Sequence, residues 1–262
     1  LVNGNSNADL SDTFNLALTF SRNSKATGDS GPQRTGIPMT DGLLEGLDIA
    51  VLGNHEFDRG CEVLKTGLAD ANFPVLSANV HGSKFMAMNK DYSCAAIAEA
   101  KGMRIGFIGL TTAVDTRVGQ ESDPDLAVSS PVEAVRNLLP AVASICDVVV
   151  ILSHCGYGSG NHMSGKAATN RMIGEGDFDI AAAAAPLTDK PIVLIGGHSH
   201  TRLNAEGIDL DNMIEGVLLT QAEANGAYLG EIAMSIAADQ GRKSDRGGCA
   251  DKSRRHERAH SG

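Results

Sequence analysis

The sequence lacks any run of about eighteen apolar residues, so we expect it to contain no transmembrane helix. Its five cysteines are an odd number and form no Cys-x-x-Cys pair, which argues against a zinc ribbon and against a dense disulfide framework. It also lacks an excess of positive charge. The net charge of −10 argues against a nucleic-acid backbone as a partner.

With 262 residues, the chain can bury one sizeable core, and one or two domains are possible. It begins with Leu1 and shows no charged-then-apolar leader, so we expect a mature form or a fragment. Residues 242–262 carry seven Lys/Arg against three Asp/Glu, so this tail is +4 and the rest is −14. We therefore predict a folded domain over residues 1–240 and a basic, polar, disordered tail over 241–262.

Short apolar runs rich in Val and Ile predict buried strands at residues 47–52, 74–78, 104–110, 147–153 and 191–196. The runs do not alternate with polar residues, which is typical of strands covered on both faces. Two further strands are predicted at 216–220 and 228–236, the second as an antiparallel, hairpin-like edge.

Apolar residues at helical spacing predict a helix over residues 132–145, with Pro131 just ahead as a start signal. Weaker versions of the same pattern predict helices over 61–70 and 11–21, and an alanine run predicts a helical turn at 181–185. Strands that alternate with helices indicate an α/β layered domain. Cys146 and Cys155 flank an apolar run and are predicted to be packed thiols.

Polar, metal-capable side chains gather in loops, mostly where a predicted strand ends. In open α/β sheets, ligands bind outside the carboxyl ends of the strands. A single histidine at a strand end is usually a satisfied structural residue, whereas four such clusters favour one shared site. Their members are Asp29 in TGDSG, then Asn54, His55 and Asp58 in GNHEFD, then His154, and finally His198 and His200.

Imidazole, carboxylate and amide oxygen suit divalent ions such as Zn, Mn and Fe. Asp29 has two oxygens with which to bridge two ions, and two-metal sites hold their ions about 3.5–4 Å apart to clamp a phosphoryl group. We expect Gly53 and Gly197 to permit sharp turns into the site. On an extended segment, the i, i+2 spacing of His198 and His200 would put both rings on the same side.

The motifs GDSG, GNHEFD, ILSHCG and GGHSHT, in this order, resemble those of the calcineurin-like metallophosphoesterases. The form GNHEFD and the later TQAEANGAYLGEI resemble the 5′-nucleotidase branch in particular. The resemblance runs from about residue 11 to residue 236. It implies an α/β fold, the four-layer α/β/β/α sandwich of the family, incomplete at its N-terminus.

The resemblance also implies roles for the metal-capable residues. Asp29 matches the aspartate that bridges two divalent ions, which would be Zn, Mn or Fe. Asn54, His154 and His198 match the other ligands of the second metal, and His200 matches the last ligand of the first. No Asp-x-His precedes Asp29, so the first site would keep only Asp29 and His200 and would be incomplete.

By the same resemblance, His55 matches the non-ligand histidine that stabilises the phosphoryl charge or protonates the leaving oxygen. Asp58 matches the carboxylate that orients His55, because a carboxylate on one ring nitrogen sets the tautomer. Glu56 is expected to face away as a supporting residue. Family nucleotidases also stack the base between aromatic rings of a C-terminal domain. This sequence is only 4% aromatic, so base recognition is not assigned.

Three functional hypotheses follow. The first is a metal-dependent phosphoester hydrolase of the 5′-nucleotidase type, in which a metal-bound hydroxide attacks phosphorus while the His–Asp pair assists. The second is an inactive or single-metal scaffold that binds phosphate without turnover. The third is a 2′,3′-cyclic nucleotide phosphodiesterase or another phosphoesterase of the same fold. The partner would be a small-molecule phosphate ester, and relatives of this branch imply a periplasmic or cell-surface location.

Overall fold

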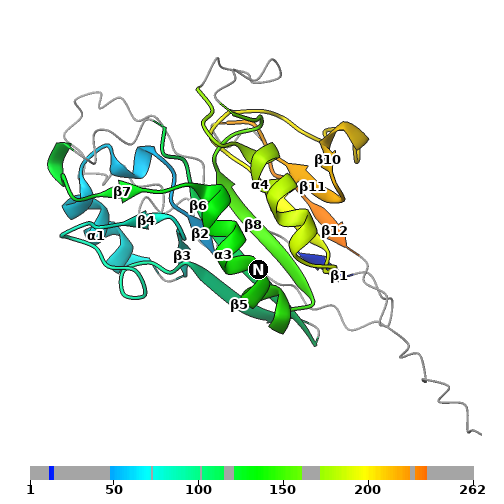
Figure 1. The fold of residues 1–262 in the computed structure, drawn as a ribbon, viewed down its shortest axis with the longest axis horizontal. Helices are drawn as coiled ribbons and strands as arrows, with labels where there is room; N and C mark the ends of the chain where they lie inside the picture. Colours follow the sequence, from blue (N-terminus) through cyan, green and yellow to red (C-terminus); the bar gives the residue numbers. More distant parts are fainter. Residues whose placement is uncertain are drawn as a thin grey trace, which may run out of the picture.

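The computed structural model describes residues 12–14, 48–71, 73–100, 102–114, 121–160, 172–224 and 228–234. Its centre is a six-stranded sheet in the order β10-β11-β9-β8-β6-β5 (Figure 1). The inner strands are parallel to one another and are β6 (Met103–Thr111), β8 (Val148–His154), β9 (Ile192–Ile195) and β11 (Val217–Thr220). The edge strands β5 (Ala95–Ala100) and β10 (Met213–Ile214) are antiparallel to their neighbours.

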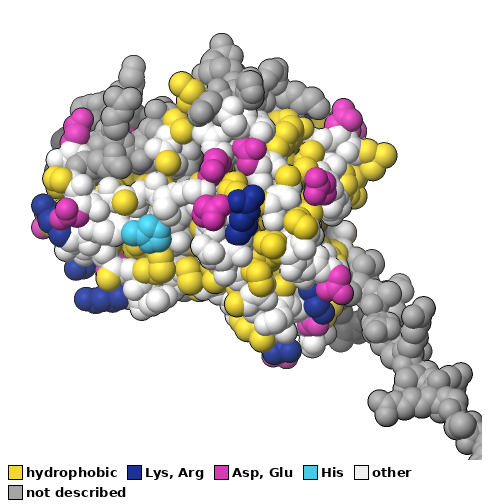
Figure 2. Space-filling model, in the orientation of Figure 1, with side chains coloured by type: hydrophobic (Ala, Val, Ile, Leu, Met, Phe, Trp, Pro, Cys, Tyr) yellow, Lys and Arg dark blue, Asp and Glu magenta, His cyan; other side chains and the backbone are white. Residues whose placement is uncertain are grey.

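Two helices, α3 (Pro131–Ile145) and α4 (Asp177–Ala184), cover one face of this sheet (Figure 1). Helix α3 begins where Ser130 caps it, since the Ser130 hydroxyl accepts a hydrogen bond from the Glu133 amide at 3.0 Å. Its buried residues recur at helical spacing and pack against β6 and β8. Over this helix-covered face, acidic and basic side chains are interspersed (Figure 2).

The opposite face of the sheet packs on a second, smaller sheet. Strand β2 (Ala50–Val51) pairs in parallel with β3 (Val75–Leu76), and residues flanking β2 continue its alternation. Ile49 and Val51 pack toward the six-stranded sheet, whereas Ala50 and Leu52 pack toward α1 (Cys61–Asp70). The order of layers is therefore α3 and α4, large sheet, small sheet, α1, which is the expected α/β/β/α sandwich.

The remaining elements are short. Strand β1 (Asp12–Phe14) pairs antiparallel with β12 (Ile232–Met234), and β4 (Val80–His81) pairs antiparallel with β7 (Ala127–Val128). Single 3₁₀ turns are η2 (His55–Phe57), η3 (Ala185–Leu187) and η4 (Leu210–Asn212). Among the helices of the described ranges, none combines the length and the apolar character needed to cross a bilayer.

Most predicted elements are confirmed. Strands β2, β3, β6, β8, β9, β11 and β12 each overlap a predicted run, and the helices predicted over 132–145 and 61–70 are α3 and α1. The alanine run belongs to α4 and η3, and both Cys146 and Cys155 are buried free thiols. The strands are covered on both faces, as expected. In β9, Ile192 and Leu194 face the helices while Val193 and Ile195 face the small sheet.

Two sequence predictions are wrong. The helix expected over 11–21 is contradicted at Asp12–Phe14, which is strand β1, because pairing with β12 overrides a weak helical pattern. This partner also makes β12 an antiparallel strand but not half of a hairpin.

Strand β5 was not predicted from the sequence. It has the sequence AAIAEA, and its pairing with β6 outweighs the helical propensity of Ala and Glu. The predicted tail 241–262 lies outside the described residues.

Candidate functional site

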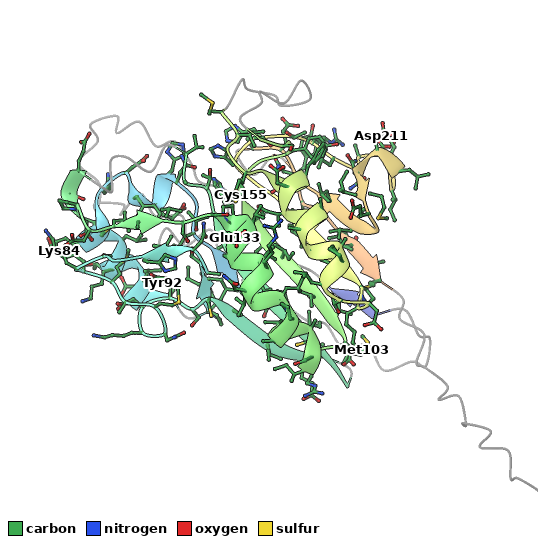
Figure 3. All side chains as sticks on the ribbon, in the orientation of Figure 1. Lys84, Tyr92, Met103, Glu133, Cys155 and Asp211 are labelled. Atoms are coloured by element: carbon green, nitrogen blue, oxygen red, sulfur yellow. The ribbon has the colours of Figure 1, made fainter. Side chains whose placement is uncertain are left out.

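Three loops meet at one edge of the molecule because the strands before them end there. In Figure 3, Met103 marks the edge where β6 begins, and Cys155, just after β8, marks the opposite edge. Asn54 follows β2, His154 ends β8 and His198 follows β9 at that second edge. All three side chains are buried.

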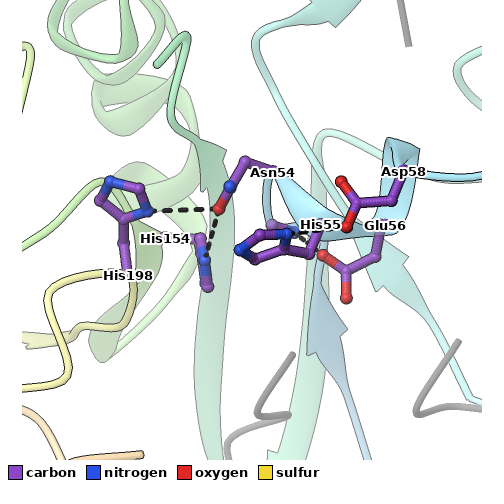
Figure 4. Close-up of polar contacts among 7 residues, drawn as sticks. Asn54, His55, Glu56, Asp58, His154 and His198 are labelled. Carbon is purple, nitrogen blue, oxygen red and sulfur yellow. Dashed lines mark hydrogen bonds and ion pairs between the residues drawn. The ribbon is translucent and has the colours of Figure 1, made fainter. Parts of the chain in front are cut away.

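The Asn54 side chain faces two histidines that come from different strands. Its Oδ1 atom lies 3.1 Å from Nε2 of His154 and 3.2 Å from Nδ1 of His198 (Figure 4). The two imidazole rings are 5.5 Å apart at an interplanar angle of 65°. One amide oxygen and two ring nitrogens thus converge within a few ångströms of one another.

The backbone carbonyl of Met172 sets the tautomer of His198. This oxygen lies 3.0 Å from Nε2 of His198 and can only accept, so the ring hydrogen lies on Nε2. In the neutral ring, Nδ1 then directs a lone pair toward the Asn54 side chain. Metal-binding histidines characteristically donate their other N–H to such a carbonyl, so this arrangement fits a role of His198 as a ligand.

The His154 ring is enclosed by two glycines. A Cβ atom on Gly197 would lie 2.9 Å from Nδ1 of His154, and one on Gly53 would lie 2.9 Å from two of its ring carbons. Neither glycine has a positive φ. The expectation that these glycines permit sharp turns is therefore wrong. They are needed instead because the backbone passes close to the His154 ring, and any side chain at either position would displace the imidazole.

The loop after β9 is not extended, contrary to expectation. His198 and His200 have φ angles of 67° and 54°, in the left-handed region that residues with a Cβ adopt at a cost of roughly 1–3 kcal/mol. His198 is buried and His200 is half-buried. The segment is thus not the extended strand on which the i, i+2 spacing was expected to put both rings on one side.

His55 and Asp58 form a pair at the mouth of the site. Nδ1 of His55 lies 2.8 Å from Oδ2 of Asp58, across one turn of η2, and both side chains reach solvent at 21% and 45% exposure. The other ring nitrogen, Nε2, is buried and has no hydrogen-bond partner within the described part of the chain. The carboxylate therefore holds Nδ1–H and leaves Nε2 available for a ligand.

Glu56 is buried and supports the loop at Gly53. The Gly53 amide donates to Oε2 of Glu56 at 2.7 Å, and burial raises the pKa of this carboxyl group. A second support comes from Thr111, whose hydroxyl donates to the Leu52 carbonyl at 2.8 Å. The chain on either side of Gly53 is thus fixed before it reaches Asn54.

A buried carboxyl group lies behind His154. The Ser153 hydroxyl donates to Oδ1 of Asp177 at 2.5 Å, and burial raises the pKa of Asp177 to about 8. Sequence reasoning did not find Asp177. It also missed the Met172 carbonyl, because a backbone oxygen leaves no signal in residue type.

The residues present fit part of a divalent-ion site. Asn54, His154 and His198 supply three donors of suitable chemistry, whereas Asp29, the expected fourth and bridging ligand, lies outside the described residues. Among the described residues, there is no group of three His, Cys, Asp or Glu side chains that could hold a metal ion. A site built from the described residues would therefore need the Asn54 amide beside the two histidines.

Known proteins resemble this chain in sequence and in fold. A probable 5′-nucleotidase of Treponema pallidum is 29% identical over 188 residues, covering 71% of this chain and 30% of that protein. A 5′-nucleotidase precursor from Thermus thermophilus superposes with a TM-score of 0.53 at 29% identity, over 73% of this chain and 36% of that one.

The chain is similar in sequence and fold to 5′-nucleotidases. A calcineurin-like phosphoesterase of Bacillus subtilis, YfkN, has the same fold, with a TM-score of 0.54 over 73% of this chain and 59% of that chain at 24% identity. No family model matches the chain, so the similarity rests on these individual relatives. The chain spans about a third of the length of the curated 5′-nucleotidases that it matches.

Proposed function

We propose that the chain carries the metal-binding half of a phosphoester hydrolase of the 5′-nucleotidase type, with a nucleotide as substrate. The observation that supports this most is the Asn54 oxygen, which faces two imidazole nitrogens directly beside the His55–Asp58 pair. A structural cluster would need neither the strained backbone at His198 nor the buried Nε2 of His55, which has no hydrogen-bond partner among the described residues.

The proposed ligands of one divalent ion are Asp29, Asn54, His154 and His198, and the proposed ligands of a second ion are Asp29 and His200. Zn, Mn and Fe suit this mixture of carboxylate, amide and imidazole. When bound, such ions neutralise phosphate oxygens and activate water for attack on phosphorus. The Met172 carbonyl would keep the Nδ1 lone pair of His198 directed at its ion.

His55 would act at the leaving side of the ester. In its protonated form, Nδ1–H is held by Asp58 and Nε2–H points away from that carboxylate, free to donate. As the P–O bond breaks, the proton on Nε2 would pass to the leaving oxygen and yield a neutral alcohol, which leaves His55 neutral. Asp58 would stabilise the positive charge of the imidazolium before the transfer and keep the ring aligned.

The test is phosphate release by the purified 262-residue chain with Mn²⁺ or Zn²⁺. We expect hydrolysis of an aryl phosphate and of AMP that stops when a chelator removes the ion. His81 is exposed and its ring bonds the Ser129 hydroxyl, away from the site, so His81→Ala is the matched control for His55→Ala.

The outcomes separate the three hypotheses. Faster cleavage of 2′,3′-cyclic AMP than of AMP would assign the chain to the cyclic phosphodiesterases. Absence of turnover with one bound ion or none would overturn the proposal in favour of an inactive scaffold. Metal content is therefore measured on the same samples.

We also propose that the protein acts in the periplasm or at the cell surface, by resemblance to exported members of this branch. Fractionation of cells that express the full-length protein would test this. Activity confined to the cytoplasmic fraction would contradict it.

A further inference from the structure

Two left-handed residues flank Ser199 in the loop that follows β9. Because His198 and His200 both carry a Cβ, this backbone persists only if neighbouring groups hold it. The bond from the Ser199 amide to the Gly197 carbonyl, 2.8 Å, lies within the loop and spans only one of the two strained residues. The hydroxyls of Ser199 and Thr201, 2.9 Å apart, span the other. A single side chain that spans both comes from another element.

Gln221 provides such a restraint. Its Nε2 donates to the Gly197 carbonyl at 3.0 Å, just before the first strained residue. Its Oε1 accepts from the Thr201 amide at 2.5 Å, just after the second, and from the Ser199 hydroxyl at 3.1 Å. One side-chain amide thus clamps both ends and the middle of the loop from Gly197 to Thr201.

The position of Gln221 follows from strand order. Strand β11 is parallel to β9 and adjacent to it, so the residue after β11 lies beside the loop after β9. The main chain is joined there as well, because the Gly196 amide donates to the Thr220 carbonyl and the Leu203 amide donates to the Gln221 carbonyl. Gln221 is 1% exposed, so water cannot replace its bonds.

We propose that Gln221 is a positioning residue that holds the backbone of His198 and His200 in the conformation that presents their rings to a divalent cation. The cation-binding role rests on the proposed function, whereas the clamp on the loop does not. A glutamine suits the task because it donates and accepts at once. An aliphatic side chain of similar size would leave the buried Thr201 amide without its acceptor.

The experiment compares Gln221→Leu and Gln221→Glu in the 262-residue chain, and its control is Asn212→Leu. Asn212 is equally buried, and its side chain bonds the Tyr157 hydroxyl and Asn204 rather than a residue of the loop 197–201. Tyr157 contacts that loop through its backbone amide, which donates to the Ser199 hydroxyl at 2.9 Å. The first readout is the ¹⁵N spectrum of the histidine rings without metal, assigned by single histidine substitutions. The second is Zn²⁺ affinity by competition with a chromophoric chelator, and thermal unfolding shows that each variant is folded.

In Gln221→Leu, we expect the ring signals of His198 and His200 to shift or broaden and Zn²⁺ affinity to fall about 10- to 100-fold, the usual effect of losing an outer-shell partner. Gln221→Glu keeps the acceptor for the Thr201 amide but loses the donor to the Gly197 carbonyl, so its effect on both readouts should lie between those of the wild type and Gln221→Leu. If Gln221→Leu does not fold, Gln221→Glu still tests whether Gln221 holds the loop. Asn212→Leu should leave both readouts unchanged, even where its stability falls.

Unchanged histidine spectra in the Gln221 variants would overturn the proposal, and so would an equal change in Asn212→Leu. If the wild-type chain binds no Zn²⁺, the proposed function fails instead. The metal-free ring spectra then still decide whether Gln221 holds the loop.

Discussion

Oδ1 of Asn54 lies 3.1 Å from Nε2 of His154, although one hundred positions separate these residues in the chain. The two side chains meet because β2 in the small sheet and β8 in the large sheet end at the same edge of the sandwich. Layer packing, rather than any local motif, therefore creates the site.

Asn54→Ala should weaken Zn²⁺ or Mn²⁺ binding by about 10- to 100-fold, because it removes the oxygen that both imidazoles face. Isothermal titration calorimetry would measure the change. Asn212→Ala deletes another buried amide, whose partners are Tyr157 and Asn204 and not the histidines, and should bind metal as the wild type does. Equal affinity in Asn54→Ala would remove Asn54 from the ligand set.

His55→Ala should lower kcat for phosphate-ester cleavage by about 10²- to 10⁴-fold, the usual contribution of a general acid. Metal content should change little, because Nδ1 of His55 bonds Asp58 and the ring is no proposed ligand. Asp58→Asn should lower kcat by less, since it keeps a hydrogen-bonding group but loses the charge. A loss of metal in His55→Ala would show that the residue binds an ion.

Gly197→Ala should weaken metal binding and destabilise the protein by about 1–3 kcal/mol, because the new methyl would lie 2.9 Å from Nδ1 of His154. Denaturant unfolding and metal titration measure the two effects. Gly230→Ala is the matched control, since its methyl would meet only Ala222 at an ordinary 3.9 Å. If Gly197→Ala and Gly230→Ala had the same stability and metal affinity, the close approach of residue 197 to His154 would not matter for either property.

Asp177 should make stability depend on pH. Burial raises its pKa from 3.8 to about 8, so between these values the folded protein keeps a proton that the unfolded chain releases. The stability that this proton contributes is complete below about pH 4 and is lost as the pH rises toward about 8.

Asp177→Asn cannot ionise, so the wild-type Tm relative to that of the variant should fall as the pH rises through this window. Thermal unfolding of both proteins from pH 4 to pH 9 would measure the difference. A constant difference would show that Asp177 does not change its charge in the folded state.

Much of the site followed from residue order alone. Apolar runs of Val and Ile predict buried strands wherever they occur, and a polar residue directly after such a run must lie at a sheet edge. Asn54, His154 and His198 were found in this way, and so was the His55–Asp58 pair, whose i, i+3 spacing on one turn brings the side chains together. These relationships are local, so the sequence suffices to state them.

Only the tertiary structure decided how the loops are held. The left-handed backbone of His198 and His200, the close approach of Gly53 and Gly197 to His154, and the clamp from Gln221 all join residues from different strands. Strand β1 likewise exists through its pairing with β12. Each depends on contacts between segments far apart in the chain, and these contacts outweigh local preferences of order 1 kcal/mol or less per residue.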